Sequence, residues 1–204
     1  MFTDRKYKRK FALLMCNNLK GCQEDIIRLD KMLYDFEKVK KIYCYPKKEI
    51  ENFLLNNNFE ENDLLYIHYS GHGVKRGKKV NGSVKILTAW LNPDKSVTTS
   101  NEIDAMLSKL KCDIILTTDC CHSSTFGDFY TGNSPYTFIG TSSLNTISKT
   151  YLVNGALLGS LVSLFEHLID SNIEINIANL KQSYKKFFKE RNMQSELIIK
   201  SFSL

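Results

Sequence analysis

A thiol and an imidazole occupy two short polar motifs of this sequence. Cys121 lies in Asp119-Cys-Cys-His-Ser-Ser124, and His72 lies in Ser70-Gly-His-Gly73. A cysteine becomes a strong nucleophile when a neighbouring base raises its thiolate fraction, and histidine is the usual base. The glycines on either side of His72 allow the backbone to turn tightly and to approach a substrate carbonyl. These residue types therefore indicate nucleophilic catalysis by a cysteine–histidine pair.

Each motif directly follows an apolar segment typical of a buried strand, residues 64–69 in one case and 113–118 in the other. Such strands alternate with helical patterns along the chain, which favours a mainly parallel sheet covered by helices on both faces. Because ligands of such sheets bind at the carboxyl ends of the strands, we expect the two motifs to meet there. The remaining expected elements are strands at 11–16, 41–45, 136–140 and 196–202, a hairpin piece at 84–88, a basic loop at 71–82, and helices at 22–40, 47–58, 100–111, 154–171 and 176–191.

Both motifs resemble those of the metacaspases, cysteine peptidases with the caspase fold. The separation of 121 − 72 = 49 residues is close to that of caspase-like enzymes. Gly21-Cys-Gln-Glu-Asp25 matches a third family pattern more loosely, and Gly140-Thr-Ser-Ser and Asn154-Gly-Ala fit the last third of the family. The resemblance implies a caspase-like three-layer α/β sandwich formed by one domain, residues 1–204, with residues 1–9 as a flexible basic tail.

The resemblance also implies roles for individual groups. It identifies Cys121, rather than Cys120, as the nucleophile, because the family's cysteine directly precedes His-Ser. His72 would act as general base and acid. The backbone N–H groups of Gly73 and Cys121 would form the oxyanion hole, in which one donor commonly contributes ~3 kcal/mol.

Metacaspases cut after arginine or lysine, so the resemblance implies protein or peptide substrates with these residues at the cleaved position. Two carboxylates suit this preference, since a guanidinium binds carboxylates through paired hydrogen bonds. The positions that match the family's first-subsite pocket are Asp25 and Asp119, with Cys22 and Ser70 on its wall.

The sequence departs from the family between the two motifs, where many metacaspases hold calcium with aspartates. Residues 74–88 contain no aspartate or glutamate and five basic residues. The nearest acids, Asp94 and Asp128, are too scattered to make a site, because calcium requires a set of oxygen ligands. We therefore expect an enzyme with no metal and no cofactor.

The segment after the nucleophile also departs from the family. No arginine or lysine occurs from Cys121 to Ser148, and the first basic residue is Lys149. Family members that cut themselves there do so after a basic residue. We expect a chain that is active uncut, and place any self-cleavage in the basic loop at Lys75–Lys79.

The bulk composition describes an ordinary soluble globular protein, with 204 residues, 43% hydrophobic and 25% charged residues, and a net charge of +6. The basic residues form no face with aromatic support, which argues against nucleic-acid binding. No apolar run reaches the ~20 residues that span a bilayer, which argues against a membrane protein. Six cysteines without a CxxC pair give little support for zinc. We expect a reduced, cytoplasmic protein that is a monomer.

Several alternatives remain open from the sequence. A catalytically silent caspase-fold module, used for binding or regulation, would have the same fold. Asp119 could cap the turn that follows it, and Asp25 could stabilise the positive end of a helix. We expect His68 to be a core residue and His122 to take no part in the chemistry.

Overall fold

The computed structural model describes residues 6–17, 19, 21–42, 47–80, 82–153, 155–192 and 194–202. A six-stranded sheet lies at its centre, in the order β11-β8-β7-β3-β1-β2. Neighbouring strands are parallel except for β11, which is antiparallel to β8. The strand bounds are β1 Arg9–Cys16, β2 Lys38–Ile42, β3 Asp63–Ser70, β7 Asp113–Asp119, β8 Tyr136–Gly140 and β11 Ile198–Phe202.

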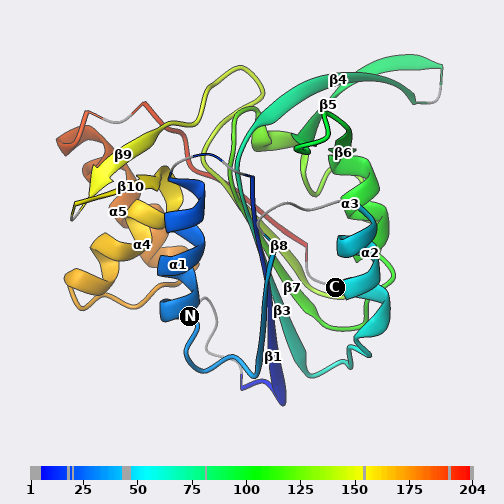
Figure 1. The fold of residues 1–204 in the computed structure, drawn as a ribbon, viewed down its shortest axis with the longest axis horizontal. Helices are drawn as coiled ribbons and strands as arrows, with labels where there is room; N and C mark the ends of the chain where they lie inside the picture. The colour runs from blue at the N-terminus through cyan, green and yellow to red at the C-terminus, as the bar shows by residue number, and fades with distance from the viewer. Residues whose placement is uncertain are drawn as a thin grey trace.

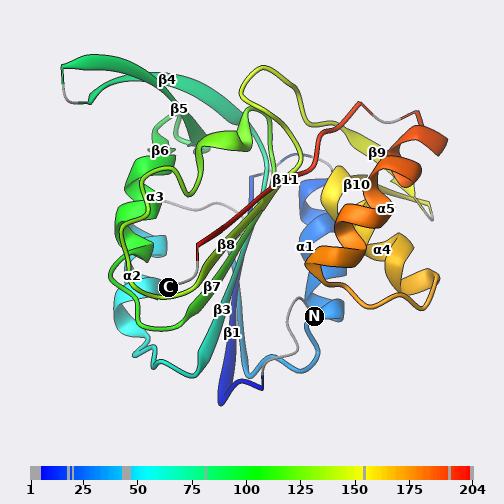
Figure 2. The ribbon, with the colours of Figure 1, turned by 180° about the vertical axis from the view of Figure 1, so that it is seen from behind.

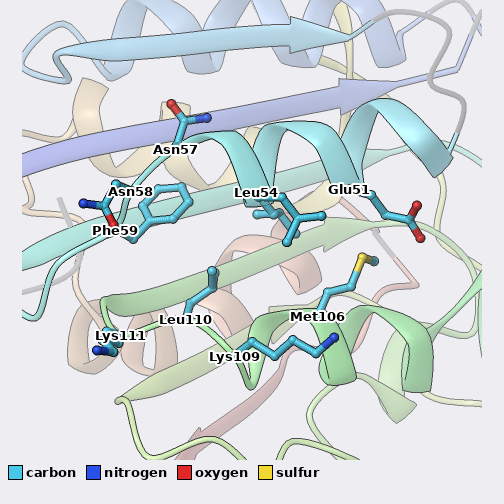
Figure 3. A pocket seen from close by; sticks show the side chains of 10 residues that line it. Glu51, Leu54, Asn57, Asn58, Phe59, Met106, Lys109, Leu110 and Lys111 are labelled. Atoms are coloured by element: carbon cyan, nitrogen blue, oxygen red, sulfur yellow. The ribbon is translucent and has the colours of Figure 1, made fainter.

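Helices cover both faces of this sheet (Figures 1 and 2). One layer contains α1 (Cys22–Met32), α4 (Ser160–Asp170) and α5 (Ile177–Glu190), and the other contains α2 (Lys47–Asn56) and α3 (Ser100–Leu107). Since side chains alternate along a strand, each face of the sheet has its own hydrophobic cluster. The predicted three-layer α/β sandwich with a mainly parallel sheet is confirmed.

Two small antiparallel sheets stand beside the central one. The strands β4 (Gly73–Val80), β5 (Ser83–Leu91) and β6 (Val97–Thr99) form the first, and β9 (Thr150–Val153) and β10 (Ala156–Gly159) form the second. The hairpin of β4 and β5 extends away from the body of the molecule (Figure 1). A short 3-10 helix, Ser123–Thr125, follows β7.

The basic loop expected at residues 71–82 is wrong in its larger part, because β4 occupies residues 73–80 and pairs along its length with β5. Its exposed lysines and glycines resemble loop composition, and its partner strand is not visible in the local pattern.

Three helix predictions are also wrong at their ends. The helix expected at 22–40 ends at Met32, and β2 begins at Lys38. Of the strand expected at 41–45, residues 43–45 lie outside the described residues. The helix expected from residue 154, which itself lies outside the described residues, begins at Ser160, because Ala156–Gly159 pairs with β9. The helix expected at 100–111 ends at Leu107. Short apolar runs do not distinguish strand from helix by periodicity, and element ends are the least certain feature of any sequence pattern.

The expected tail of residues 1–9 is partly held against the domain. Strand β1 already begins at Arg9, whose guanidinium hydrogen bonds to the buried Asp63 carboxylate at 2.5 and 3.0 Å. Lys8 donates its backbone N–H to Asn62 at 2.8 Å. Residues 1–5 lie outside the described residues. None of the helices in the described part of the chain is long and apolar enough to cross a membrane.

Candidate active site

The register of two central strands brings the two polar motifs together. Ser70, the last residue of β3, lies opposite Asp119, the last residue of β7. His72 and Cys121 each follow two residues later, beyond the same edge of the sheet. Both line one pocket with a volume of about 660 Å³, together with Cys22, Ser70, Asp119 and the segment 147–150.

The two neighbouring cysteines of the second motif face different surroundings. Cys121 is partly exposed, and its Sγ lies 3.8 Å from the carbonyl oxygen of Ser148. Cys120 is 1% exposed and belongs to the hydrophobic cluster on the α2–α3 face. Burial raises the pKa of the Cys120 thiol well above its ordinary value, so this thiol stays protonated. Of the two, Cys121 presents its sulfur to the pocket.

His122 turns the chain immediately after Cys121. Its φ of 58° lies in the left-handed region, which is unfavourable for a side chain with a Cβ. The conformation is held by contacts on three sides. The backbone N–H donates to Thr146 at 3.2 Å, the ring Nδ1 lies 2.8 Å from the carbonyl oxygen of Leu144, and the carbonyl accepts from the Thr88 hydroxyl. Through these bonds, His122 holds the loop that carries Cys121 in place.

The two glycines around His72 are required by close packing. A Cβ on Gly71 would lie 2.6 Å from the Tyr69 hydroxyl, and a Cβ on Gly73 would lie 1.9 Å from the carbonyl oxygen of Cys121. The carbonyl of His72 accepts hydrogen bonds from the Tyr69 hydroxyl at 2.9 Å and from the backbone N–H of Leu91 at 3.0 Å. The histidine loop is therefore fixed in direct contact with the main chain of Cys121.

The two aspartates predicted for the substrate pocket lie in different layers. Asp119 is 5% exposed and lines the pocket. Asp25, from α1, is fully buried behind Ser70, whose hydroxyl donates to its Oδ2 at 2.5 Å. The backbone N–H of Gly159 donates to Asp25 Oδ1 at 2.8 Å. Asp25 therefore lies behind Ser70 rather than among the described residues that line the pocket, and its role in the substrate pocket stays a prediction.

Different donors reach the two carboxylates. Asp119 accepts from the Thr141 hydroxyl at 2.8 Å and from the backbone N–H groups of Leu161 and Val162, at the start of α4, at 2.9 and 3.1 Å. Burial raises the pKa of Asp119, and these donors oppose the rise. Burial and the nearby Asp119 raise the pKa of Asp25 well above its ordinary value. The donors to Asp119 therefore favour its charged form over that of Asp25.

His68 is the site residue that sequence reasoning missed, since it was expected only as core. It is fully buried, and one of its ring nitrogens lies within 4.8 Å of a carboxylate oxygen of each aspartate. Its Nδ1 lies 2.8 Å from the Thr117 hydroxyl, and its Nε2 has no hydrogen-bond partner among the described residues. Burial lowers the pKa of His68 to about 3, so the ring is neutral. The period of two along β3, which aligns His68 with Ser70, was the available signal.

The cluster of Asp25, His68 and Asp119 also contains the ligand types of a metal site. However, backbone N–H and hydroxyl donors already bond to both carboxylates. The arrangement fits a buried acid pair with a neutral neighbour better than a set of open metal ligands. Cys22 closes the pocket from α1, and burial raises the pKa of its thiol to about 11, which makes it a neutral wall.

Solved structures show which fold this is. Protein GSU0716 from Geobacter sulfurreducens superposes with a TM-score of 0.74 at 12% identity, over 96% of this chain and 94% of that chain. Caspase-1 from Spodoptera frugiperda superposes with a TM-score of 0.53 at 13% identity, over 100% and 92% of the two chains. Its pro form gives a TM-score of 0.52 at 15% identity, over 99% and 94%. The chain is therefore a caspase-fold protein.

The family follows from the sequence itself. Residues 6–130 match the family model described as metacaspase, peptidase C14 domain. The chain therefore belongs to the metacaspase family, a family of cysteine peptidases, as its motifs predicted. A search of curated proteins gave no match. Membership of a peptidase family implies protein substrates.

Proposed function

We propose that this metacaspase-family chain is a cysteine endopeptidase that hydrolyses peptide bonds after arginine or lysine. The observation that carries the proposal is the alignment of Ser70 with Asp119 across β3 and β7. His72 and Cys121 line one pocket together with Asp119, and the buried Asp25 lies behind it.

In the proposed reaction, His72 takes the proton of the Cys121 thiol, and the thiolate attacks the carbonyl carbon of the scissile bond. The oxyanion that forms accepts hydrogen bonds from the backbone N–H groups of Gly73 and Cys121. The C–N bond then breaks, and the leaving amine takes its proton from His72. Water, deprotonated by His72, hydrolyses the remaining thioester and restores the thiol.

The acid pair supports the preference for a basic side chain at the cleaved position. Asp119 faces the pocket with its charged form favoured by its donors, and Asp25 reaches it through the Ser70 hydroxyl. A buried carboxylate attracts a cation strongly because little water screens the interaction. Cys22 and Ser70 form neutral walls around the entering side chain.

Activity without calcium belongs to the same proposal. The two acids nearest to the expected calcium region are already engaged: Asp94 accepts from Ser96 at 2.6 Å, and Asp128 pairs with Lys200 at 2.5 Å. The β4–β5 hairpin, which lies between the two catalytic motifs in the sequence, exposes Lys75, Arg76, Lys78, Lys79 and Lys85. Positive charges of this density disfavour a bound divalent cation.

The test is the initial rate of cleavage of fluorogenic peptides that end in arginine, lysine or aspartate. Each peptide is measured with a calcium chelator and with added calcium. Cys121→Ala removes the proposed nucleophile, and Cys120→Ala is the matched control at the adjacent buried thiol. We expect arginine and lysine cleavage in chelator, lost in Cys121→Ala and retained in Cys120→Ala.

Other outcomes lead to other assignments. Cleavage that requires calcium would contradict the calcium-independent part of the proposal and leave the peptidase. Cleavage of the aspartate peptide alone would contradict the role of the acid pair. Folded protein that cleaves none of the peptides would favour the catalytically silent binding module.

A further inference from the structure

The fully buried His68 lies beneath the pocket, beside the two carboxylates that are proposed to receive a basic side chain. It comes from β3, Asp25 comes from α1, and Asp119 comes from the end of β7. A ring nitrogen and one oxygen of each carboxylate lie within 4.8 Å of one another. Three elements therefore bring one imidazole and two acids into a single buried cluster.

The hydrogen bonding of His68 is incomplete in this cluster. Nδ1 is engaged by the Thr117 hydroxyl, which also lies 2.8 Å from the Tyr66 hydroxyl. Nε2 is buried with no partner among the described residues. A buried polar nitrogen without a partner is unfavourable, because burial removes the water that would bond to it. A state of the protein that supplies a partner is therefore favoured.

A basic side chain in the pocket creates such a state. In the empty pocket the pair shares one negative charge, because two adjacent buried carboxylates disfavour double ionisation. A guanidinium or ammonium group at Asp119 compensates the repulsion, so the second carboxylate ionises as the cation binds. Asp25 then needs a new hydrogen-bond donor, since its donors within the described part of the chain are the Ser70 hydroxyl and the Gly159 N–H.

We infer that His68 is a positioning residue of this pocket, whose Nε2–H stabilises the doubly ionised Asp25–Asp119 pair when an arginine or lysine side chain binds. The inference rests on the proposed preference for basic residues. His68 acts through the carboxylates and does not touch the substrate. The proposed tautomer has the Thr117 hydroxyl donating to Nδ1 and accepting from the Tyr66 hydroxyl, so that Nε2 carries the proton.

His68, Cys22 and Tyr66 around the cluster are neutral, so the charge of the cluster comes from the two acids. His68 is neutral, since burial lowers its pKa to about 3, and it therefore does not repel an incoming cation. Cys22, from α1, has a pKa raised by burial to about 11, and burial likewise raises the pKa of Tyr66, from β3. Glu24 of α1 adds a weaker repulsion to Asp25. The pH dependence of cation binding should therefore reflect the ionisation of the acid pair.

The test compares two amide substitutions of His68, each made in the Cys121→Ala background. In His68→Asn the amide reaches the place of Nδ1 and keeps the contact with Thr117. In His68→Gln the amide reaches the place of Nε2. The probe is an acetylated peptide that ends in arginine, and its Kd is measured by calorimetry in chelator from pH 6 to pH 9. Thermal unfolding of each variant verifies that it is folded.

We expect His68→Asn to weaken binding about tenfold at pH 7. The increase in affinity that accompanies ionisation of the acid pair should move to higher pH by about one unit, since one pKa unit corresponds to a factor of ten. His68→Gln should bind within about twofold of the parent.

Two results would overturn the inference. Equal Kd values for both variants and the parent would show that Nε2 is not used. An equal loss in both variants with an unchanged pH profile would show that His68 only supports the core. These results are separate from a failure of the proposed function, in which wild-type protein cleaves no arginine peptide and the Cys121→Ala parent does not bind the probe.

Discussion

Asp25 and Asp119 differ in the number and kind of donors that reach them, and this difference decides how they share charge. Asp119 accepts from two backbone N–H groups at a helix start and from a hydroxyl. Asp25 accepts from one backbone N–H and one hydroxyl. The start of a helix favours a negative charge, which adds to the advantage of Asp119. Asp25 is therefore the carboxyl that is costly to ionise.

Asp25→Asn should make the empty protein more stable and weaken its binding of basic substrates. A pKa raised in the folded state means that the folded protein holds this proton more tightly, so the stabilisation is lost as pH rises through the raised value. Asparagine does not ionise, so the gain in Tm should grow as pH rises above the ordinary Asp pKa of 3.8 and level off above the raised pKa. KM for arginine peptides should rise at least about tenfold, equivalent to ~1.4 kcal/mol.

The matched control for this prediction is Asp30→Asn, on the same helix, where the carboxylate is partly exposed and pairs with Lys41 at 2.8 Å. This variant should change Tm and KM little, because exposed ion pairs contribute ~0–1 kcal/mol. A Tm that falls in Asp25→Asn at every pH would contradict the assignment of the costly charge to Asp25.

Gly73→Ala should abolish most activity, because the new Cβ would meet the carbonyl oxygen of Cys121 at 1.9 Å. Either the histidine loop or the cysteine loop must move, and displacements of about 1 Å can cost about a hundredfold in rate. We expect kcat/KM to fall by at least about that factor. The control is Gly77→Ala on the same strand, where the nearest atom is Val84 Cγ1 at 3.5 Å. Comparable losses in both variants would show that the strand, not the contact, is responsible.

Part of the site was predictable at this scale and part was not. The pairing of His72 with Cys121 follows from motifs that each end a buried strand. The layer of Asp25 and the position of His68 depend on how α1 packs across β3, which the sequence pattern does not specify. The exclusion of Cys120 followed from family resemblance, and its burial in the opposite cluster now gives a physical reason.

Among the elements, α4 is joined to the site at its first turn. Its N-cap residue, Gly159, has no side chain to accept the free N–H groups of the helix start. Asp119 of β7 accepts the N–H groups of Leu161 and Val162 instead. One side chain therefore caps a helix and faces the pocket, and the helix it caps is α4 rather than the turn directly after Asp119 that the sequence suggested.

Asp119→Ala should lower the free energy of unfolding by about 2 kcal/mol, because it leaves buried N–H donors without a partner. Asp119→Asn keeps an acceptor oxygen and should lose less. A local cap gives the reference: Asn176 accepts the N–H of Asn179 at 2.9 Å, and Asn176→Ala should cost about 1 kcal/mol. Urea unfolding measures all three values. A smaller loss for Asp119→Ala than for Asn176→Ala would contradict the capping role.

The element predictions succeeded where burial determines the pattern. The apolar segments expected at 11–16, 64–69, 113–118 and 136–140 all lie in strands of the central sheet. The hairpin piece expected at 84–88 lies in β5, but its partner β4 was missed because its cations are exposed and its pairing is set by the other strand. Lys78 even lies directly opposite Lys85, a pairing that local propensity would not favour.

Over the whole molecule, the segment after the nucleophile is already packed against the catalytic loop in the continuous chain. Strand β8 lies inside the sheet between β7 and β11. The Ser142 hydroxyl donates to the carbonyl of Cys120 at 2.6 Å, and the backbone N–H of His122 donates to Thr146. These contacts require no break in the chain. Together with the absence of basic residues from 121 to 148, they favour an enzyme that acts uncut.

The uncut chain should therefore be the active species. An arginyl chloromethyl ketone, which binds by its basic side chain in the pocket and alkylates the catalytic cysteine, should label the full-length protein completely in chelator.

Intact mass spectrometry before and after substrate turnover should show one chain of 204 residues, with no fragment ending between Cys121 and Lys149. Cys121→Ala should stay full-length and unlabelled, and any fragment that appears in it as well would come from contaminants. The β4–β5 hairpin should also stay intact, because paired strands do not offer the extended, unpaired backbone that a peptidase binds. Label found only on a fragment would contradict this prediction, since the active form would then require a cut that the contacts of residues 141–148 make unnecessary.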